Sequence, residues 1–379
     1  MQRRTVFPTS THQVNPILRS LAFICLFSFF LAACQASSAA PLETLPPTLK
    51  TATTNPTQTT TPKQSATVIT PFPSIQPSET SLPSPTPSRQ VLLMAVGDIM
   101  LGRTIGELIE SDGASAPFKD TADTLKMADI TVGNLECPIS AGGIPEAKTY
   151  AFRAPPSAAE SLAYAGFNLV NLANNHSLDY GPQALKDTLD HLSAQSIHAV
   201  GAGLNAADAY APVFIEANGL RLAFVGFVDV HPTDYDYRTW EAGPNKPGVA
   251  WAHEERVKEG VTAAKAEADI VIVLVHNGYE LVQQVSSQQQ KIAHIAIDSG
   301  ASLVIGSHPH VLQRVEHYQD GLIAYSMGNF VFDNFLFPPN YSAILAVELS
   351  PQGVESYELI DVVVQLTGVP QIMPYNLDQ

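Results

Sequence analysis

Residues 302–310 read SLVIGSHPH, an apolar run that stops at a glycine and is followed by two histidines. The apolar run predicts a strand that is covered on both faces, because such strands are almost continuously hydrophobic. Pro309 has no backbone N–H to donate, so the chain should turn or leave the sheet directly after this strand. On an extended backbone His308 and His310 would point the same way, a spacing that suits two ligands of one metal ion or of adjacent ions.

Earlier in the chain, similar apolar runs alternate with helical segments, and this alternation predicts an α/β layered domain. Apolar runs typical of strands cover residues 91–96, 130–134, 167–173, 221–228 and 269–276. Segments with helical character lie between the strands, at residues 157–166, 181–192, 253–268 and 287–297. Ser157 and Glu160 have the spacing of a capping box, and Pro182 stands at a favourable first helical position.

The last part of the chain has a different pattern of predicted elements. Residues 322–330, 343–350 and 357–366 read as strands that follow one another without helices between them. Such a succession is typical of antiparallel strands joined by short turns. It predicts an antiparallel portion that completes a second sheet.

The first 33 residues have the features of a secretory signal. Arg3, Arg4 and Arg19 precede the apolar run LAFICLFSFFLAA, which is short for a transmembrane helix and fits the core of a signal peptide. The run ends in LAAC and resembles a bacterial lipoprotein signal, in which Cys34 would carry the lipid. An uncleaved anchor helix is the alternative. Both interpretations place the remainder outside the cytoplasm at the bacterial membrane, in the first case through a lipid anchor.

The composition of residues 34–90 predicts a disordered tether, because a stretch rich in Pro, Thr and Ser cannot bury enough apolar surface to fold. The folded domain is then expected over residues 91–379. Of the three cysteines, Cys25 and Cys34 lie in the N-terminal region, so no disulfide framework is available to this domain. Cys137 is either a small buried hydrophobe or a reactive thiol.

The 379-residue chain is acidic, with a formal net charge of −16. This balance argues against nucleic acid as a partner, because phosphate backbones attract Lys and Arg. It does not exclude phosphate chemistry, because a bound metal ion can supply positive charge locally.

Polar side chains gather where the predicted strands end. They are Asp98, Asn134, Glu136, Asn175, His176, Asp179, His276, Glu280, His308 and His310. Because the carboxyl ends of strands open onto the ligand crevice of an α/β sheet, five segments can deliver them to one edge. Carboxylate, amide and imidazole donors without thiolates suit one or two divalent ions, Mn²⁺, Fe or Zn²⁺. Such ions bind phosphate groups and generate hydroxide from water at neutral pH. Taken singly, each residue is also compatible with a turn or a hydrogen-bonded core position.

Six motifs carry a resemblance to a known family. In order, they read GDIML, GNLE, NNHSLDYG, HNGYE, GSHPHVLQ and YSMGNFVFD. The set resembles the CapA family of capsule-synthesis (poly-γ-glutamate) proteins, a branch of the calcineurin-like metallophosphoesterase superfamily, over about residues 91–335. The resemblance implies a four-layer α/β/β/α sandwich of metallophosphoesterase type, with a dinuclear metal site at the strand ends.

The resemblance also implies how the metal ligands divide. Asp98 and His310 would bind the first ion. The second ion would be bound by a further set, namely Asn175, His276 and His308. Glu136 would lie near the bridging position, with Asn134 as its rival for that place.

His176 would be a non-ligand histidine beside the substrate, where it protonates the leaving oxygen or stabilises the phosphoryl group. Met100 departs from the wider superfamily, whose first motif begins Asp-x-His. A thioether is a poor ligand for Mn²⁺ or Zn²⁺ among oxygens, so the first ion lacks a ligand unless Asp179 or Glu280 replaces it. The number of bound ions is therefore open.

These features predict a surface-anchored, metal-dependent hydrolase of a phosphoester or related bond, linked to the synthesis or export of capsule or poly-γ-glutamate. The alternative is a non-catalytic accessory that binds or guides an anionic surface polymer through metal bridging. A third interpretation makes the histidines plain core and turn residues. Residues 231–248, which contain Tyr, Trp and Arg, are a candidate wall of the substrate pocket.

Overall fold

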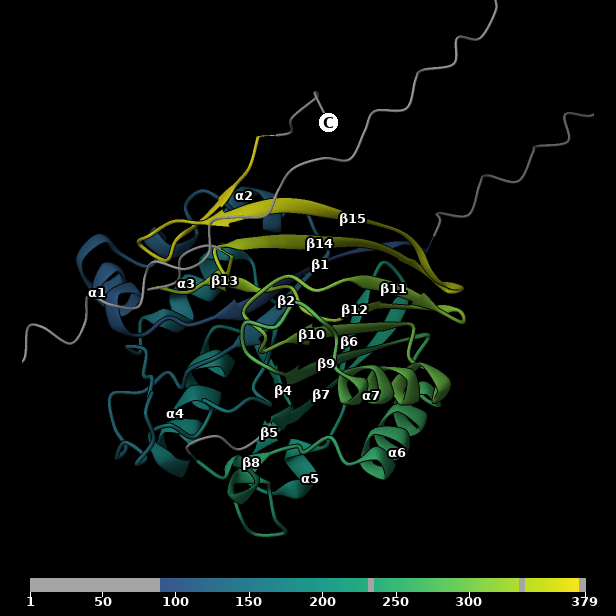
Figure 1. Ribbon diagram of the computed structural model, residues 1–379, viewed down its shortest axis with the longest axis horizontal. Coiled ribbons are helices and arrows are strands. Elements are labelled where there is room, and N and C mark those ends of the chain that lie inside the picture. Colours follow the sequence, from purple (N-terminus) through teal and green to yellow (C-terminus); the bar gives the residue numbers. More distant parts are fainter. Residues whose placement is uncertain (1–88, 231–234, 334–337, 375–379) are drawn as a thin grey trace, which may run out of the picture. The chain divides into compact units, whose positions relative to one another are not determined.

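The computed structural model describes residues 89–230, 235–333 and 338–374 (Figure 1). The predicted signal sequence, Cys34 and nearly all of the predicted tether lie outside the described residues, so these assignments stay predictions. Within the described ranges, no helix has both the length and the apolar character that crossing a bilayer requires.

The first large sheet contains the strands nearest the N-terminus. In spatial order its strands are β16 (Pro370–Ile372), β15 (Gly353–Val364), β14 (Tyr341–Ser350), β1 (Val91–Ile99), β2 (Ile130–Leu135), β3 (Leu169–Asn171) and β4 (His198–Val200), with β13 (Asn329–Val331) also paired to β1. Strands β1 to β4 are parallel, whereas β14, β15 and β16 are antiparallel to their neighbours.

The second large sheet is mostly parallel. Its spatial order is β11 (Val315–Tyr318), β12 (Gly321–Ala324), β10 (Leu303–Ser307), β9 (Ile270–Gly278), β7 (Leu220–Val230) and β6 (Val213–Ala217). The parallel strands are β7, β9, β10 and β12, and the antiparallel edges are β6 and β11. A small pair, β5 (Ala202–Gly203) and β8 (Gly248–Val249), lies apart from both large sheets.

The prediction that the C-terminal strands complete the second sheet is wrong. Strands β14 and β15 are antiparallel as predicted, but β14 pairs with β1 and so extends the first sheet instead of completing the second. Val347 of β14 lies opposite Leu93 of β1, and both side chains are buried between the two sheets. An apolar strand can bury its face equally well in either sheet, so the local pattern does not choose between them.

The layers are α/β/β/α, as the sequence predicted. A core between the sheets joins residues such as Leu93 and Val132 of the first sheet to Phe224 and Ile272 of the second. The outer face of the first sheet is covered by α1 (Arg103–Asp112), α2 (Ala122–Leu125), α3 (Ala158–Ala165) and α4 (Gly181–Ala194). The outer face of the second is covered by α6 (Glu254–Lys265) and α7 (Ser287–Asp298) (Figure 1). Each buried Leu- or Val-sized side chain in these three cores stabilises the fold by roughly 1.5–3 kcal/mol.

The shorter helical elements complete the described chain. They are the 3-10 helix η2 (Ala116–Phe118), α5 (Ala206–Ala209) and the 3-10 helix η3 (Tyr237–Trp240). Pro182 lies in the first turn of α4, as predicted. The predicted capping box at Ser157 is wrong, because its side chain makes no capping hydrogen bond and its backbone is already helical. An N-cap residue needs an extended backbone to aim its oxygen at the first turn. A capping box is formed instead by Ser286 and Gln289, at the start of α7.

Candidate metal centre

Sheet register brings the strand-end residues together. Asp98 on β1 lies opposite Asn134 on β2, which in turn lies opposite Asn171 on β3. In the second sheet, His276 on β9 lies opposite Ser307 on β10. In parallel strands such neighbours share one edge, so donors that are distant in sequence become adjacent.

His308 and His310 follow β10 in a strained turn. Their φ angles are +96° and +57°, in the left-handed region that side chains with a Cβ seldom adopt. The extended backbone that the sequence suggested for this pair is therefore wrong. Two hydrogen bonds stabilise the turn: the His308 N–H donates to Oδ2 of Asp98 at 3.2 Å, and the Leu281 N–H donates to the Pro309 carbonyl at 2.8 Å. Backbone strain of this kind costs roughly 1–3 kcal/mol and is found mainly at functional sites.

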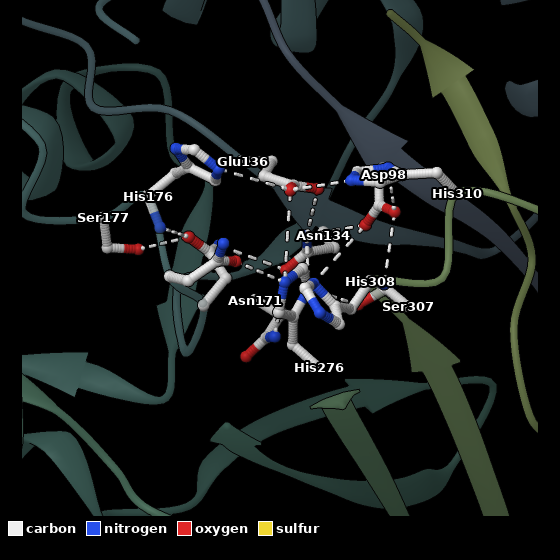
Figure 2. Close-up of polar contacts among 12 residues, drawn as sticks. Asp98, Asn134, Glu136, Asn171, His176, Ser177, His276, Ser307, His308 and His310 are labelled. Atoms are coloured by element: carbon white, nitrogen blue, oxygen red, sulfur yellow. Dashed lines mark hydrogen bonds and ion pairs between the residues drawn. The ribbon is translucent and has the colours of Figure 1, made fainter. Parts of the chain in front are cut away.

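Glu136 lies at the centre of the histidines. Figure 2 shows it between the imidazole of His176 on one side and Asp98 with His310 on the other. Its Oε1 atom is 3.6 Å from Nε2 of His310, 3.9 Å from Nε2 of His176 and 4.0 Å from Nε2 of His276. Four buried side chains therefore direct donor atoms at one small volume.

Two buried atoms of the gathered strand-end residues are compatible with a bound cation. Oε1 of Glu136 and Nδ1 of His308 are buried and have no hydrogen-bond partner among the described residues. An uncompensated buried polar atom costs roughly 1–3 kcal/mol, which a bound ion would relieve. Donor atoms that share one ion at about 2.1 Å lie about 3.0–3.6 Å apart when the angle at the ion is about 90–120°. The separation between Glu136 and His310 falls in this range.

Candidate donors with ligand atoms within 4.8 Å of one another form two groups. One contains Glu136, His308 and His310, and the other contains Asp98, Glu136 and His276. Glu136 is common to both, which is the arrangement expected of a bridging ligand. The division of the remaining ligands between two ions, and the number of ions, stay predictions.

His276 and Asn175 form a direct pair at this centre. Nε2 of His276 lies 2.7 Å from Oδ1 of Asn175, so in the metal-free protein the ring donates its Nε2 proton to the amide oxygen. Nδ1 of His276 lies 2.9 Å from the Ser307 hydroxyl, which can donate to it. A divalent ion bound by Nε2 and Oδ1 would take the place of that shared proton.

A chain of asparagines fixes how Asn134 faces the centre. Asn171 accepts the Ala173 N–H at 3.1 Å, and Asn174 accepts the His176 N–H at 3.0 Å, so both side-chain oxygens are committed. Their amide groups donate to Oδ1 of Asn134 at 3.1 and 3.2 Å.

Asn134 consequently turns its own NH₂ group toward the centre. That group donates to Oδ1 of Asp98 at 2.9 Å and lies 3.1 Å from Nδ1 of His276 and 3.4 Å from Oε2 of Glu136. With its oxygen directed away, Asn134 holds the carboxylates in place and offers no ligand atom in this orientation.

Asp98 and His310 are tied together on the β1 side. Nδ1 of His310 is 2.8 Å from Oδ1 of Asn329 and 3.2 Å from Oδ2 of Asp98. A proton on Nδ1 satisfies both oxygens and leaves the Nε2 lone pair for an ion. Asn329 was not among the predicted site residues, although it lies in the quoted motif YSMGNFVFD and pairs with Asp98 across β13 and β1.

Burial shifts the acidities of these groups in directions that favour cation binding. Burial, with the nearby charge of Asp98, raises the pKa of Glu136 well above its usual range. Burial alone would raise the pKa of Asp98, but the hydrogen bond and charge of His310 outweigh it and lower that pKa. Burial lowers the pKa of His276 to about 3 and the pKa of His308 well below its usual range. Both imidazoles are therefore neutral at pH 7, as metal ligands must be.

His310 behaves differently from the other two imidazoles. Burial opposes its protonation, but the hydrogen bond and the charge of Asp98 prevail and raise the pKa of His310. Asp98 therefore favours a protonated ring at His310 more than burial allows at His276 or His308.

His176 lies beside the donors and is held by Asp179. Nδ1 of His176 is 2.7 Å from Oδ2 of Asp179, and the imidazole stacks on Phe152 with ring centroids 4.3 Å apart. Burial lowers the pKa of His176, the charge of Asp179 raises it, and the charge of Lys148 lowers it again, so the net direction is downward. Lys148, whose ammonium is 2.7 Å from Oδ1 of Asp179, was not among the predicted site residues.

The remaining predicted residues lie outside the donor groups. Asp179 is engaged by His176 and Lys148, and Glu280 is exposed, so the replacement of a ligand by either residue stays a prediction. Met100 is buried in the outer core of the first sheet, and its sulfur accepts the Gly102 N–H at 3.1 Å. Burial raises the pKa of Cys137 to about 12, so this residue is a small buried thiol and not a reactive one.

The chain is similar to several known proteins. The chain is 34% identical over 267 residues to the PGA biosynthesis protein CapA of Bacillus subtilis (strain 168), covering 70% of this chain and 69% of that protein. It is 31% identical over 303 residues to the capsule biosynthesis protein CapA of Bacillus anthracis, covering 77% of this chain and 72% of that protein. Among solved structures, the 5'-nucleotidase from Candida albicans SC5314 matches with a TM-score of 0.41 and 10% identity, over 73% of this chain and 52% of that chain.

A family-level match covers most of the described residues. The profile of the family described as "Bacterial capsule synthesis protein PGA_cap" matches residues 92–334, which include all six motifs and both donor groups. The chain belongs to the bacterial capsule synthesis protein (PGA_cap) family.

Proposed function

We propose that this protein is a metal-dependent hydrolase of a phosphoester or a related bond, and that it acts in the synthesis or export of capsule or poly-γ-glutamate. The relatives named for these processes support the second part of the proposal. We further propose that Cys34 anchors the protein by a lipid at the outer side of the bacterial membrane, which the N-terminal sequence supports.

One observation carries the hydrolase proposal. Oε1 of Glu136 is buried without a hydrogen-bond partner among the described residues, and Nε2 atoms of three imidazoles lie within 4.0 Å of it. A purely structural core would pair such an oxygen with a donor, because leaving it unpaired destabilises the fold. An unpaired carboxylate oxygen among imidazoles is what a cation site looks like before the cation binds.

The protein's residues divide the chemistry between them. One or two divalent ions would be held by Asp98, Glu136, Asn175, His276, His308 and His310. A bound ion there supplies positive charge to an anionic substrate and acidifies a bound water. Asp179 holds the proton on Nδ1 of His176, so Nε2 of that ring faces the centre and can accept or return a proton at the substrate oxygen.

The test uses the full-length protein in mild detergent, stripped with chelator and reloaded with Mn²⁺ or Zn²⁺. We expect hydrolysis of bis(p-nitrophenyl) phosphate or p-nitrophenyl phosphate that depends on the metal and falls about 10²- to 10⁴-fold in His176→Ala. His198→Ala, which changes an exposed histidine on β4, is the matched control and should retain activity. No hydrolysis with any metal, or full activity in His176→Ala, would refute the catalytic proposal. Chelator-sensitive binding of polyglutamate without turnover would then favour the non-catalytic accessory.

A further inference from the structure

Lys148 is a buried lysine beside the candidate centre. It belongs to the segment between β2 and α3, and 1% of its side chain is exposed. Its ammonium group donates to Oδ1 of Asp179 at 2.7 Å and to the backbone carbonyl of Asn175 at 2.7 Å. Asp179 is fully buried, so the ion pair is shielded from solvent.

The proton between Asp179 and His176 defines what Lys148 can do. Nδ1 of His176 is 2.7 Å from a carboxylate oxygen, a distance that requires a proton between the two atoms. Nδ1 therefore carries hydrogen, and the 3.3 Å approach of the Lys148 ammonium to it cannot be a hydrogen bond, because both atoms are donors. Lys148 acts on the imidazole through Asp179 and not directly.

The 3-10 helix η3 (Tyr237–Trp240) also contacts Lys148. The ammonium lies 4.7 Å from the ring centroid of Tyr237 and 5.1 Å from that of Trp240, within the range of a cation–π contact. The Trp240 indole N–H donates to the Tyr235 hydroxyl at 3.0 Å, and that hydroxyl donates to Glu146 at 3.0 Å. Part of the predicted pocket wall thus fixes the lysine behind the histidine.

Packing alone does not explain a lysine here. A buried ion pair is often no more stabilising than apolar side chains of the same volume, because both charges lose their hydration. An aliphatic side chain would fill the space under Tyr237 and Trp240 equally well. What it could not do is donate to Asn175 and Asp179 together.

We propose that Lys148 is a positioning residue for the candidate centre. Its ammonium holds the Asp179 carboxylate in the orientation that keeps the proton of His176 on Nδ1. The same ammonium holds the backbone at Asn175, whose side chain is an expected ligand. The kinetic part of this inference rests on the proposed hydrolase function, whereas its structural part does not.

Two neutral variants of the full-length protein test the inference, Lys148→Met and Lys148→Gln. Long-range ¹⁵N–¹H correlation spectra of the metal-free protein report the tautomer of His176, assigned by comparison with His176→Gln. We expect a single Nδ1–H tautomer in the wild type and a mixture or an Nε2–H tautomer in both variants. Lys148→Arg should keep the wild-type tautomer, because it preserves the charge. If Lys148→Met does not fold, Lys148→Gln alone decides.

Kinetics supply the second measurement. On a p-nitrophenyl phosphoester with Mn²⁺, we expect kcat to fall roughly 10- to 100-fold in the neutral variants, with KM changed much less, and Lys148→Arg to recover part of the loss. Lys126→Met is the matched control, since Lys126 is also placed over a tyrosine ring, 4.3 Å from the centroid of Tyr164, but is exposed.

Two results would overturn the role of Lys148: a wild-type tautomer in a folded neutral variant, or a neutral variant with wild-type kcat. A wild-type protein without hydrolysis in any metal would refute the hydrolase proposal instead. In that case the spectra still decide the role of Lys148.

Discussion

The two carboxylates at the ends of β1 and β2 are both fully buried, yet they behave in opposite ways. Asp98 accepts hydrogen bonds from the Asn134 amide and the His308 N–H and lies beside His310, so it stays ionised. Oε1 of Glu136 has no such partner among the described residues, and burial with the charge of Asp98 raises the pKa of this carboxyl. The first is a structural anchor of the turn at His308, and the second is the open position of the centre.

The largest expected effect comes from removing the anchor. Asp98→Ala leaves His310 without its charge partner and the His308 N–H without its acceptor. We expect the free energy of unfolding of the metal-free protein to fall by about 3–5 kcal/mol. Urea denaturation in chelator measures it. Asp190→Ala, which removes an exposed ion pair within α4, should change the same quantity by less than about 0.5 kcal/mol. A small loss in Asp98→Ala would make the two carboxylates equivalent.

Metal binding should depend on Glu136. At a free metal concentration about 100 times Kd, the wild type should gain about 2.7 kcal/mol in free energy of unfolding by mass action. Glu136→Gln should lose most of this gain while its metal-free stability stays close to that of the wild type. Thermal unfolding with and without Mn²⁺, together with metal analysis, checks both statements. Glu280→Gln is the control. A matching loss there would show that the exposed Glu280 serves as a ligand.

A smaller effect is expected from changing Asn134, whose amide lies against both Asp98 and Glu136. Asn134→Leu keeps the branched shape of the side chain but removes the amide that donates to Asp98. It also takes one of two acceptors from the amides of Asn171 and Asn174, which keep only backbone carbonyls. We expect a loss of about 1–3 kcal/mol in the metal-free protein, together with weaker metal binding. Calorimetric titration with Mn²⁺ and urea denaturation measure the two quantities. Unchanged metal affinity would show that Asn134 supports the fold alone.

The smallest effect concerns the pH dependence of stability that His308 causes. Burial lowers the pKa of His308 in the folded protein, so its neutral ring stabilises the fold above the unfolded pKa near 6.5. This stabilisation is lost as the pH falls below that value. Between pH 7.5 and 5.5 the wild type should therefore lose about 1.4 kcal/mol of unfolding free energy relative to His308→Gln, because only the unfolded imidazole takes up a proton. Urea denaturation in chelator at both pH values measures the difference. His198→Gln, at an exposed position, should show no comparable difference. An equal pH response of wild type and His308→Gln would mean that His308 titrates normally in the folded protein.

The local pattern of apolar and polar residues was sufficient to predict much of the site. Continuous apolar runs located β1, β2, β7, β9 and β10, and the polar residues that follow the parallel strands were placed at one edge because their carboxyl ends must meet there. This reasoning brought Asp98, Glu136, His276, His308 and His310 into the centre from positions 98 to 310. It could not supply Lys148 or Asn329, since neither directly follows an apolar run that ends at the centre.

What the sequence by itself determined was the inventory of donors, the strand ends that carry them and the family to which the chain belongs. Only the tertiary structure decided how the donors face one another. The backbone donors of Ala173 and His176 set the amide orientation of Asn134, and the left-handed turn sets the directions of His308 and His310. The pairing of β14 with β1 was likewise a tertiary choice. The physical reason is common to all three: hydrophobic periodicity acts over a few residues, whereas an amide orientation, a strained φ angle or a strand partner depends on groups brought close only when the whole domain folds.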